Sequence, residues 1–164
     1  MTSPVSPRRT LGLLGVVGAL VSLLGGCASR VPVATAPAAG DPLCAEVVLA
    51  LPEELGGLPR LRTTSQASVA WGEQSHPVVL RCGVEPPGPT TDQCVTADDG
   101  TVAVDWLAVP QDVAEGTRWT FTTYGREPAV EVVVPAEVAA ERSTSFLTEL
   151  GPAIARVAAT RHCL

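Results

Sequence analysis

The run VVLRCGV, residues 78–84, carries the strongest secondary-structure signal in the chain and decides its fold. Apolar side chains occupy its even-numbered positions, whereas Val79 and Arg81 occupy odd-numbered ones. This two-residue period is that of a strand with one buried face and one more polar face. We therefore predict a strand over residues 77–84 that belongs to a half-buried sheet.

Similar β-rich runs follow one another along the chain, separated by short segments of turn-forming residues. They are predicted at residues 67–71, 94–96, 102–109, 118–124 and 129–134. Asp98-Asp99-Gly100 offers an Asp-Gly hairpin turn between two of them. Because strands joined by short loops pair antiparallel, we expect a largely antiparallel sheet.

One helical segment is predicted on each side of the β-rich region. Asp41 is a suitable N-cap, Pro42 suits the first helical position, and Pro52 ends the apolar face that follows. Near the other end, residues 143–159 carry an apolar stripe at helical spacing. Gly151-Pro152 interrupts that stripe, so we expect either a kink or two short helices there.

The predicted fold class is α+β. We expect a four- to five-stranded, mainly antiparallel sheet with an N-terminal and a C-terminal helix packed against one face, stapled by disulfides. Residues 53–59, which include Gly56-Gly57, are predicted as a connector between the first helix and the sheet.

The first thirty residues have the parts of an export signal. Arg8 and Arg9 form a basic start, and an apolar run over residues 11–24 is too short for a transmembrane helix, which needs roughly 20 residues. The run ends in Leu24-Gly25-Gly26-Cys27, which resembles the lipobox of bacterial lipoproteins. That resemblance implies a diacylglycerol thioether on Cys27, cleavage after Gly26 and further acylation, for example by palmitate. The alternative is an ordinary cleaved signal with an incidental cysteine.

These features predict three parts of the chain: a signal peptide over 1–26, an Ala/Pro-rich solvated tether over 27–40 and a single domain over 41–164. We expect the protein on the outer face of the plasma membrane of a bacterial cell envelope, held by lipid on Cys27. The adjacent arginines also leave the twin-arginine export route open beside the general secretory one.

Charge and composition exclude several classes of partner and chemistry. The predicted mature chain keeps nine basic residues against seventeen acidic ones, a net charge of −8, so we expect no nucleic-acid partner. Every basic residue is arginine. The absence of lysine excludes a phosphate-loop lysine, a Schiff-base lysine and an S-x-x-K acylation motif.

Four cysteines remain once Cys27 carries lipid, and an even number in an exported domain predicts two disulfides. Of the three pairings we favour Cys82 with Cys94, which bracket a Pro/Gly-rich excursion, and Cys44 with Cys163, which would fasten the chain end to the first helix. The competing hypothesis is a Cys/His metal site. No C-x-x-C or H-x-x-x-H spacing supports it, so we expect no metal.

The sequence offers little for catalysis. It contains no G-x-S-x-G elbow and no G-x-G-x-x-G loop, and its two histidines are expected at the surface. A pair of carboxylates from among Asp105, Glu127 and Glu131 could serve a glycosidase. However, Glu131 alternates with valines and is expected to pair with Arg81 or Arg126 across the sheet. We therefore predict a protein that is not an enzyme and needs no cofactor.

An aromatic binding surface is the remaining candidate site. Trp106 is expected to point into the core because it follows two valines at strand period. Trp71 and Tyr124 stand beside glycines near strand ends, where partial exposure is expected, and Arg126 next to Tyr124 could grip a carboxylate or phosphate. Trp71, Tyr124 and Arg126 are thus the predicted ligand surface.

Several segments together resemble a known family. They are residues 70–72 (AWG), 78–84 (VVLRCGV), 104–106 (VDW) and 122–132 (TTYGREPAVEV), in this order. They resemble the actinobacterial domain-of-unknown-function family numbered 3515, over about residues 42–163. The resemblance implies a small secreted protein or lipoprotein with similarly placed cysteines, and it transfers no activity.

Three hypotheses of function follow. The first is a membrane-anchored, non-catalytic binding or accessory module of the cell envelope, with an envelope protein or glycan as partner. The second is a small envelope hydrolase that uses two carboxylates on glycan. The third is a purely structural lipoprotein without a ligand.

Overall fold

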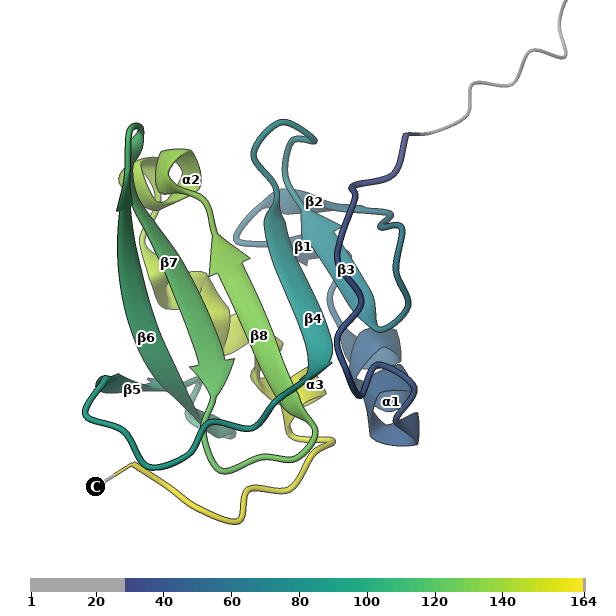
Figure 1. Cartoon of the computed structure of the whole chain (residues 1–164), viewed down its shortest axis with the longest axis vertical. Coiled ribbons are helices and arrows are strands. Elements are labelled where there is room, and N and C mark those ends of the chain that lie inside the picture. Colours follow the sequence, from purple (N-terminus) through teal and green to yellow (C-terminus); the bar gives the residue numbers. More distant parts are fainter. Residues whose placement is uncertain (1–28, 164) are drawn as a thin grey trace, which may run out of the picture.

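The structure is a computed structural model that describes residues 29–163 (Figure 1). The predicted signal peptide, its cleavage point and the predicted acylation site at Cys27 lie outside these residues. Among the described residues, no helix has the length and apolar character needed to cross a bilayer.

The core of the fold is one antiparallel sheet of eight strands within the described range. In chain order they are β1 Glu54–Leu55, β2 Leu58–Leu61, β3 Ser68–Trp71, β4 Val78–Val84, β5 Gln93–Asp98, β6 Ala103–Val113, β7 Gly116–Thr123 and β8 Ala129–Val134. Their order in space is β1-β2-β3-β4-β8-β7-β6-β5. The sheet therefore has a β1–β3 edge and a β5 edge at its two ends.

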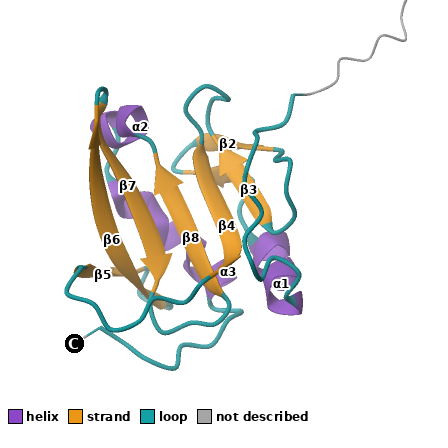
Figure 2. Cartoon of the chain, viewed as in Figure 1, coloured by secondary structure: helices purple, strands orange, loops and turns teal. Residues whose placement is uncertain are grey.

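Short helices cover the inner face of this sheet (Figure 2). They are α1 Pro42–Ala50, α2 Ala136–Glu141, the 3₁₀ helix η2 Thr144–Leu150 and α3 Gly151–Ile154. Large side chains from both layers form the single core, and Trp71, Trp106, Leu80, Leu150 and Ile154 are fully buried in it. The inward orientation predicted for Trp106 is confirmed.

The predicted four- to five-stranded sheet is wrong, because the sheet has eight strands. The two that were missed most completely are β1, which lies in the predicted connector of residues 53–59, and β2, which begins in it. β1 has two residues, too few to show a strand period, and β2 contains Pro59, which favours a connector over a strand. Gly56 and Gly57 adopt positive φ angles of 56° and 78°, which lets the chain reverse tightly between β1 and β2.

The predicted pair of helices also needs correction. α1 begins as expected, with Asp41 Oδ1 accepting a hydrogen bond of 2.8 Å from Leu43 N. The C-terminal segment divides at Gly151 into η2 and α3, which confirms the second of the two alternatives expected there, whereas α2, which precedes them, was not predicted. Pro152 explains the division, since its ring and its missing N–H prevent a continuous helix.

The solvated tether predicted for residues 27–40 does not describe residues 31–40. Val31, Ala36 and Ala39 are buried, and Val31 forms a parallel bridge with Thr63 beside β2. Ala38 N donates to Gly83 O at 2.9 Å where the segment crosses β4. Alanine and proline suggest an extended chain, but small side chains also let such a chain lie flat on a sheet.

Both disulfides form, yet with a pairing other than the favoured one. Cys44 of α1 is joined to Cys82 of β4, and Cys94 of β5 is joined to Cys163, with Cα–Cα distances of 5.4 and 6.2 Å. Cys82 and Cys94 are close in sequence, but β8, β7 and β6 separate their strands in the sheet. The pairing follows strand order in space, which the sequence alone does not reveal.

Candidate functional site

An open groove of about 510 Å³ lies beneath the β5 edge, between the inner face of β5–β7 and the helix η2. We call it the edge groove. Its lining residues come from the strands and from the start of η2: Gln93, Val95, Thr96, Ala97, Asp98, Ala108, Trp119, Phe121, Ser143, Thr144, Ser145, Leu147 and Thr148. The groove exists because η2 covers only part of this end of the sheet.

The floor of the edge groove is aromatic and aliphatic. Phe121 lies directly across from Ala108 in the β6–β7 register. Trp119 precedes Phe121 by two residues and therefore lies on the same face of β7. The two rings stack with centroids 6.0 Å apart and planes 17° apart. Trp119 is partly exposed while Phe121 is buried, so Trp119 offers the accessible ring. A flat apolar group of a ligand can lie against it.

The rim of the edge groove is polar but almost uncharged. Ser143 Oγ accepts from Ser145 N at 3.2 Å, and Thr148 Oγ1 donates to Ser145 O at 2.8 Å, so these hydroxyls are held by η2. Among the described lining residues, Asp98 is the one carboxylate and there is no basic side chain. This combination suits a neutral ligand with apolar faces and hydroxyl or amide groups.

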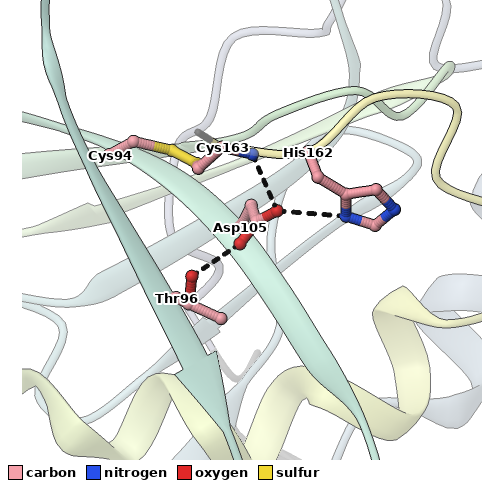
Figure 3. Close-up of a disulfide and its surroundings, with 5 residues drawn as sticks. All are labelled: Cys94, Thr96, Asp105, His162 and Cys163. Carbon is pink, nitrogen blue, oxygen red and sulfur yellow. Dashed lines mark hydrogen bonds and ion pairs between the residues drawn. A yellow bond between two sulfur atoms is a disulfide. The ribbon is translucent and has the colours of Figure 1, made fainter.

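A polar cluster lies on the opposite face of β5, around Asp105 of β6 (Figure 3). Thr96 Oγ1 donates to Asp105 Oδ1 at 2.7 Å, and Cys163 N donates to Oδ2 at 3.1 Å. His162 Nδ1 lies 3.2 Å from the same Oδ2. With the disulfide Cys94–Cys163, these contacts fasten the end of the chain to β5 and β6. We call this arrangement the C-terminal latch.

The electrostatics of the C-terminal latch favour an ionised Asp105. Burial raises the pKa of Asp105, but hydrogen bonds from Thr96, Cys163 and His162 and the charge of His162 together hold that pKa below its ordinary value. The hydroxyl of Thr96 donates its hydrogen to Asp105. The side chain of His162 is 72% exposed. The contacts of Asp105 and the disulfide join His162 and Cys163 to β5 and β6.

The predicted ligand surface of Trp71, Tyr124 and Arg126 does not form. Trp71 is fully buried, and its Nε1 donates to Pro52 O at 3.1 Å. Arg126 is only 7% exposed and donates to the carbonyls of Val157 and Ala103. Burial lowers the pKa of Arg126, and the nearby Asp105 charge opposes that effect.

Tyr124 alone stays partly exposed, and the guanidinium of Arg161 lies 5.6 Å from the centre of its ring. Glycines beside Trp71 and Tyr124 suggested exposed strand ends. In the structure Trp71 belongs to the core, and the C-terminal segment lies against the position beside Tyr124, where Thr160 N donates to Gly125 O at 2.7 Å.

The three carboxylates weighed for catalysis do not share one groove. Glu131 of β8 binds Arg81 Nη2 at 2.7 Å, so the expected cross-strand ion pair is confirmed with Arg81. Asp105 belongs to the C-terminal latch, and Glu127 is exposed in the β7–β8 loop. Across residues 29–163, no group of three or more potential metal ligands gathers.

The edge groove was not predicted from the sequence, although one signal was present. Trp119 and Phe121 alternate with polar residues, which places both on one face of a predicted strand. What the sequence did not show is that η2 would stop short of this face. An aromatic ring on the inner face of a sheet is normally covered by the next layer.

Comparison with known proteins places the chain in a family. The model of the family described as "Protein of unknown function (DUF3515)" matches residues 13–163, nearly the whole chain. The protein therefore belongs to this family. No curated protein and no solved structure matches the chain.

Proposed function

We propose that this DUF3515 protein is a lipid-anchored, non-catalytic binding module on the outer face of the plasma membrane, and that the edge groove is its ligand site. The observation that supports this most is the partly exposed Trp119 on the floor of the edge groove, under a rim of hydroxyls. An apolar floor beneath a few placed polar groups is the usual composition of a ligand site.

The membrane address rests on the sequence. Cys27 follows an apolar export segment and small residues, and acyl chains on its sulfur would contribute about 0.8 kcal/mol per buried methylene. The two disulfides agree with an oxidising compartment outside the cytoplasm. An anchored chain meets its partners in the envelope, where glycan and other exported proteins are the available ligands.

The side chains that line the edge groove favour binding over hydrolysis. A glycosidase needs two carboxyl groups on opposite sides of the scissile bond. Among the described residues that line this groove, Asp98 is the single acid. A sugar ring or an apolar peptide side chain can rest on Trp119 without being cleaved, while the η2 hydroxyls bind its polar groups.

The test places a photoreactive amino acid at Ser145, an exposed rim residue, in the full-length protein in living cells. We expect a covalent adduct with one envelope component, identified by mass, that disappears when Trp119 is replaced by alanine. The matched control carries the same probe at Ala114, which is exposed and lies outside the edge groove.

Three results would contradict the proposal. Equal adducts from Ser145 and Ala114 would show random contact rather than a site. No adduct from either position, with the protein at its normal level in the membrane fraction, would favour a purely structural lipoprotein. Release of a shortened glycan by the purified protein would favour the hydrolase.

A further inference from the structure

A second open groove, of about 520 Å³, lies at the β1–β3 edge, far across the sheet from the edge groove. Three arginines line it, Arg30, Arg60 and Arg62, with Glu53 as the one carboxylate. We call it the arginine groove. This concentration is unusual because residues 29–163 carry nine basic and seventeen acidic residues in total.

The three arginines have different tasks. Arg60 Nη1 donates to Leu51 O and its Nη2 to Val48 O, both at 3.0 Å, so Arg60 secures the end of α1. It also forms an ion pair with Glu53 at 3.3 Å. Because Glu53 pairs with Arg60, the one carboxylate of the groove is occupied. Within the described residues, Arg30 and Arg62 form no ion pair with a carboxylate.

Arg30 and Arg62 are held side by side by the backbone. Val31 N donates to Arg62 O at 2.8 Å, and Val31 pairs with Thr63 in a parallel bridge. Both arginines precede the bridged residues, and both are exposed. Like charges in register repel each other and disfavour this pairing unless an anion neutralises them.

The arginine groove lies close to the predicted anchor. Arg30 is three residues after Cys27, so their Cα atoms are at most about 11 Å apart however the intervening chain runs. That reach is comparable to the Debye length of about 8–10 Å at physiological ionic strength. If Cys27 sits at the membrane interface, Arg30 is within electrostatic range of the lipid headgroups.

An exposed leucine belongs to the same end of the molecule. Leu49 of α1 is 85% exposed, the most exposed large apolar side chain among the described residues. Its neighbour Val48 lines the arginine groove. This edge therefore carries an exposed apolar side chain on α1 as well as the exposed arginines of the groove. Surfaces that lie on bilayers combine such groups, because the apolar group enters the interface and the cations meet phosphates.

We infer that the arginine groove binds the headgroups of anionic phospholipids in the membrane that holds the Cys27 acyl chains. This inference rests on the proposed lipid anchor and adds an orientation to it. Arg30 and Arg62 bind lipid phosphates, Arg60 fixes the groove to α1, and the β1–β3 edge faces the bilayer. The β5 edge, with the edge groove, then points away from the membrane toward the envelope.

The test is chemical footprinting of arginine in the complete lipoprotein. The purified protein is reconstituted in vesicles of phosphatidylcholine alone or with roughly one-third phosphatidylglycerol, and phenylglyoxal modification of each arginine is followed by mass spectrometry. We expect about fivefold slower modification of Arg30 and Arg62 in the anionic vesicles. About 0.5 M salt should abolish the difference, since screening shortens the range of the attraction.

The internal control is Arg156, which is exposed and lies outside the arginine groove. Its modification should be equal in both vesicles. In a double variant, R30Q with R62Q, the rate at which phenylglyoxal modifies the remaining arginines should not depend on anionic lipid. The single variant R156Q should leave the protection of Arg30 and Arg62 unchanged.

Three outcomes overturn the inference. Equal modification of Arg30 and Arg62 in both vesicles, in protein whose intact mass shows acylation, removes headgroup binding but leaves the anchor in place. Protection of Arg156 together with the other two shows nonspecific adsorption. In the third outcome, soluble polyglycerol phosphate slows the modification of Arg30 and Arg62 in phosphatidylcholine vesicles, but anionic lipid does not. That result would assign the groove to a wall polymer. An unacylated intact mass contradicts the proposed function instead.

Discussion

The two edges of the sheet are each held by one end of the chain, but by different means. At the β1–β3 edge, the N-terminal segment buries Val31 and Ala36, and the nearby disulfide Cys44–Cys82 is itself fully buried. At the β5 edge, the C-terminal latch depends on a partly exposed disulfide and an exposed histidine. The first edge is part of the core, whereas the second is fastened to it from outside.

At both edges a glycine with a positive φ angle lies against a terminal segment of the chain. Gly83 in β4 has a φ of 90°, and a side chain there would collide with the backbone of Ala38. Gly125 after β7 has a φ of 70°, and a side chain there would collide with the backbone of Arg161. Each of these segments thus lies against a glycine. The N-terminal segment carries buried side chains that hold it in place, whereas residues 158–163 carry none. The difference predicts how each edge responds to damage.

The largest effect should come from the disulfides. Replacing Cys44 and Cys82 together by alanine should lower the free energy of unfolding by about 5 kcal/mol, from loop closure over 38 residues and a cavity in the core. The pair Cys94 and Cys163 closes a longer loop of 69 residues, yet its loss should cost only about 1–2 kcal/mol.

The reason is that the last residues can detach while the sheet stays folded, so the second disulfide opposes local rather than global unfolding. Urea unfolding followed by circular dichroism measures both variants. Equal losses, or a larger loss from the Cys94 and Cys163 variant, would show that loop length decides and that the two edges do not differ.

The next effect should come from the glycines. G83A should destabilise by about 3 kcal/mol, because the buried N-terminal segment must move off β4. G125A should destabilise by less, about 1–2 kcal/mol, since the chain end can detach. G100A is the matched control, because Gly100 has a φ of 88° but no neighbour within 4 Å, and should cost about 1 kcal/mol.

Thermal unfolding of the three variants gives this ranking, and hydrogen exchange locates the disturbance. In G125A, exchange should increase at residues 158–163 and leave β4 protected. A G83A variant no less stable than G100A would mean that the N-terminal segment does not lie on β4.

The smallest effect should be a pH dependence of the C-terminal latch. The pKa of Asp105 is lowered in the folded state, so its ionised form stabilises the protein above the ordinary value of 3.8. That contribution should be lost as the pH falls through the lower folded pKa. It should stay below about 1 kcal/mol because the site is partly solvated.

The variant D105N should flatten this part of the stability profile, as measured by urea unfolding between pH 2 and pH 6. The control is D112N, whose carboxylate is exposed and accepts from Thr117 at 3.1 Å. If D105N and D112N change the profile equally, Asp105 does not hold the C-terminal latch.

The sequence predicted local elements well where side chains alternate over enough residues. β4, β7 and β8 were found because residues 78–84, 118–124 and 129–134 carry the period of a strand. β1 was missed because two residues carry no period, and β2 because Pro59 is typical of a connector. Their signal was the Gly56-Gly57 pair, which indicates a reversal but not what flanks it.

Properties that depend on the arrangement of elements in space were not predictable. The disulfide pairing depends on three strands that separate Cys82 from Cys94, and the edge groove depends on how far η2 covers the sheet. Trp71 and Arg126 were expected at the surface because the chain segments that bury them are distant in sequence. The N-terminal segment was mistaken for a tether since its composition alone does not reveal its contact with Gly83.

The proposed function and orientation depend above all on a lipid anchor at Cys27, next to the β1–β3 edge. The most direct test is the mass of the native protein, intact and as unreduced peptides. We predict a first residue at Cys27 with a diacylglycerol on its sulfur, and the linked pairs Cys44–Cys82 and Cys94–Cys163. An unacylated amino terminus at another position, or a linked pair of Cys82 and Cys94, would contradict it.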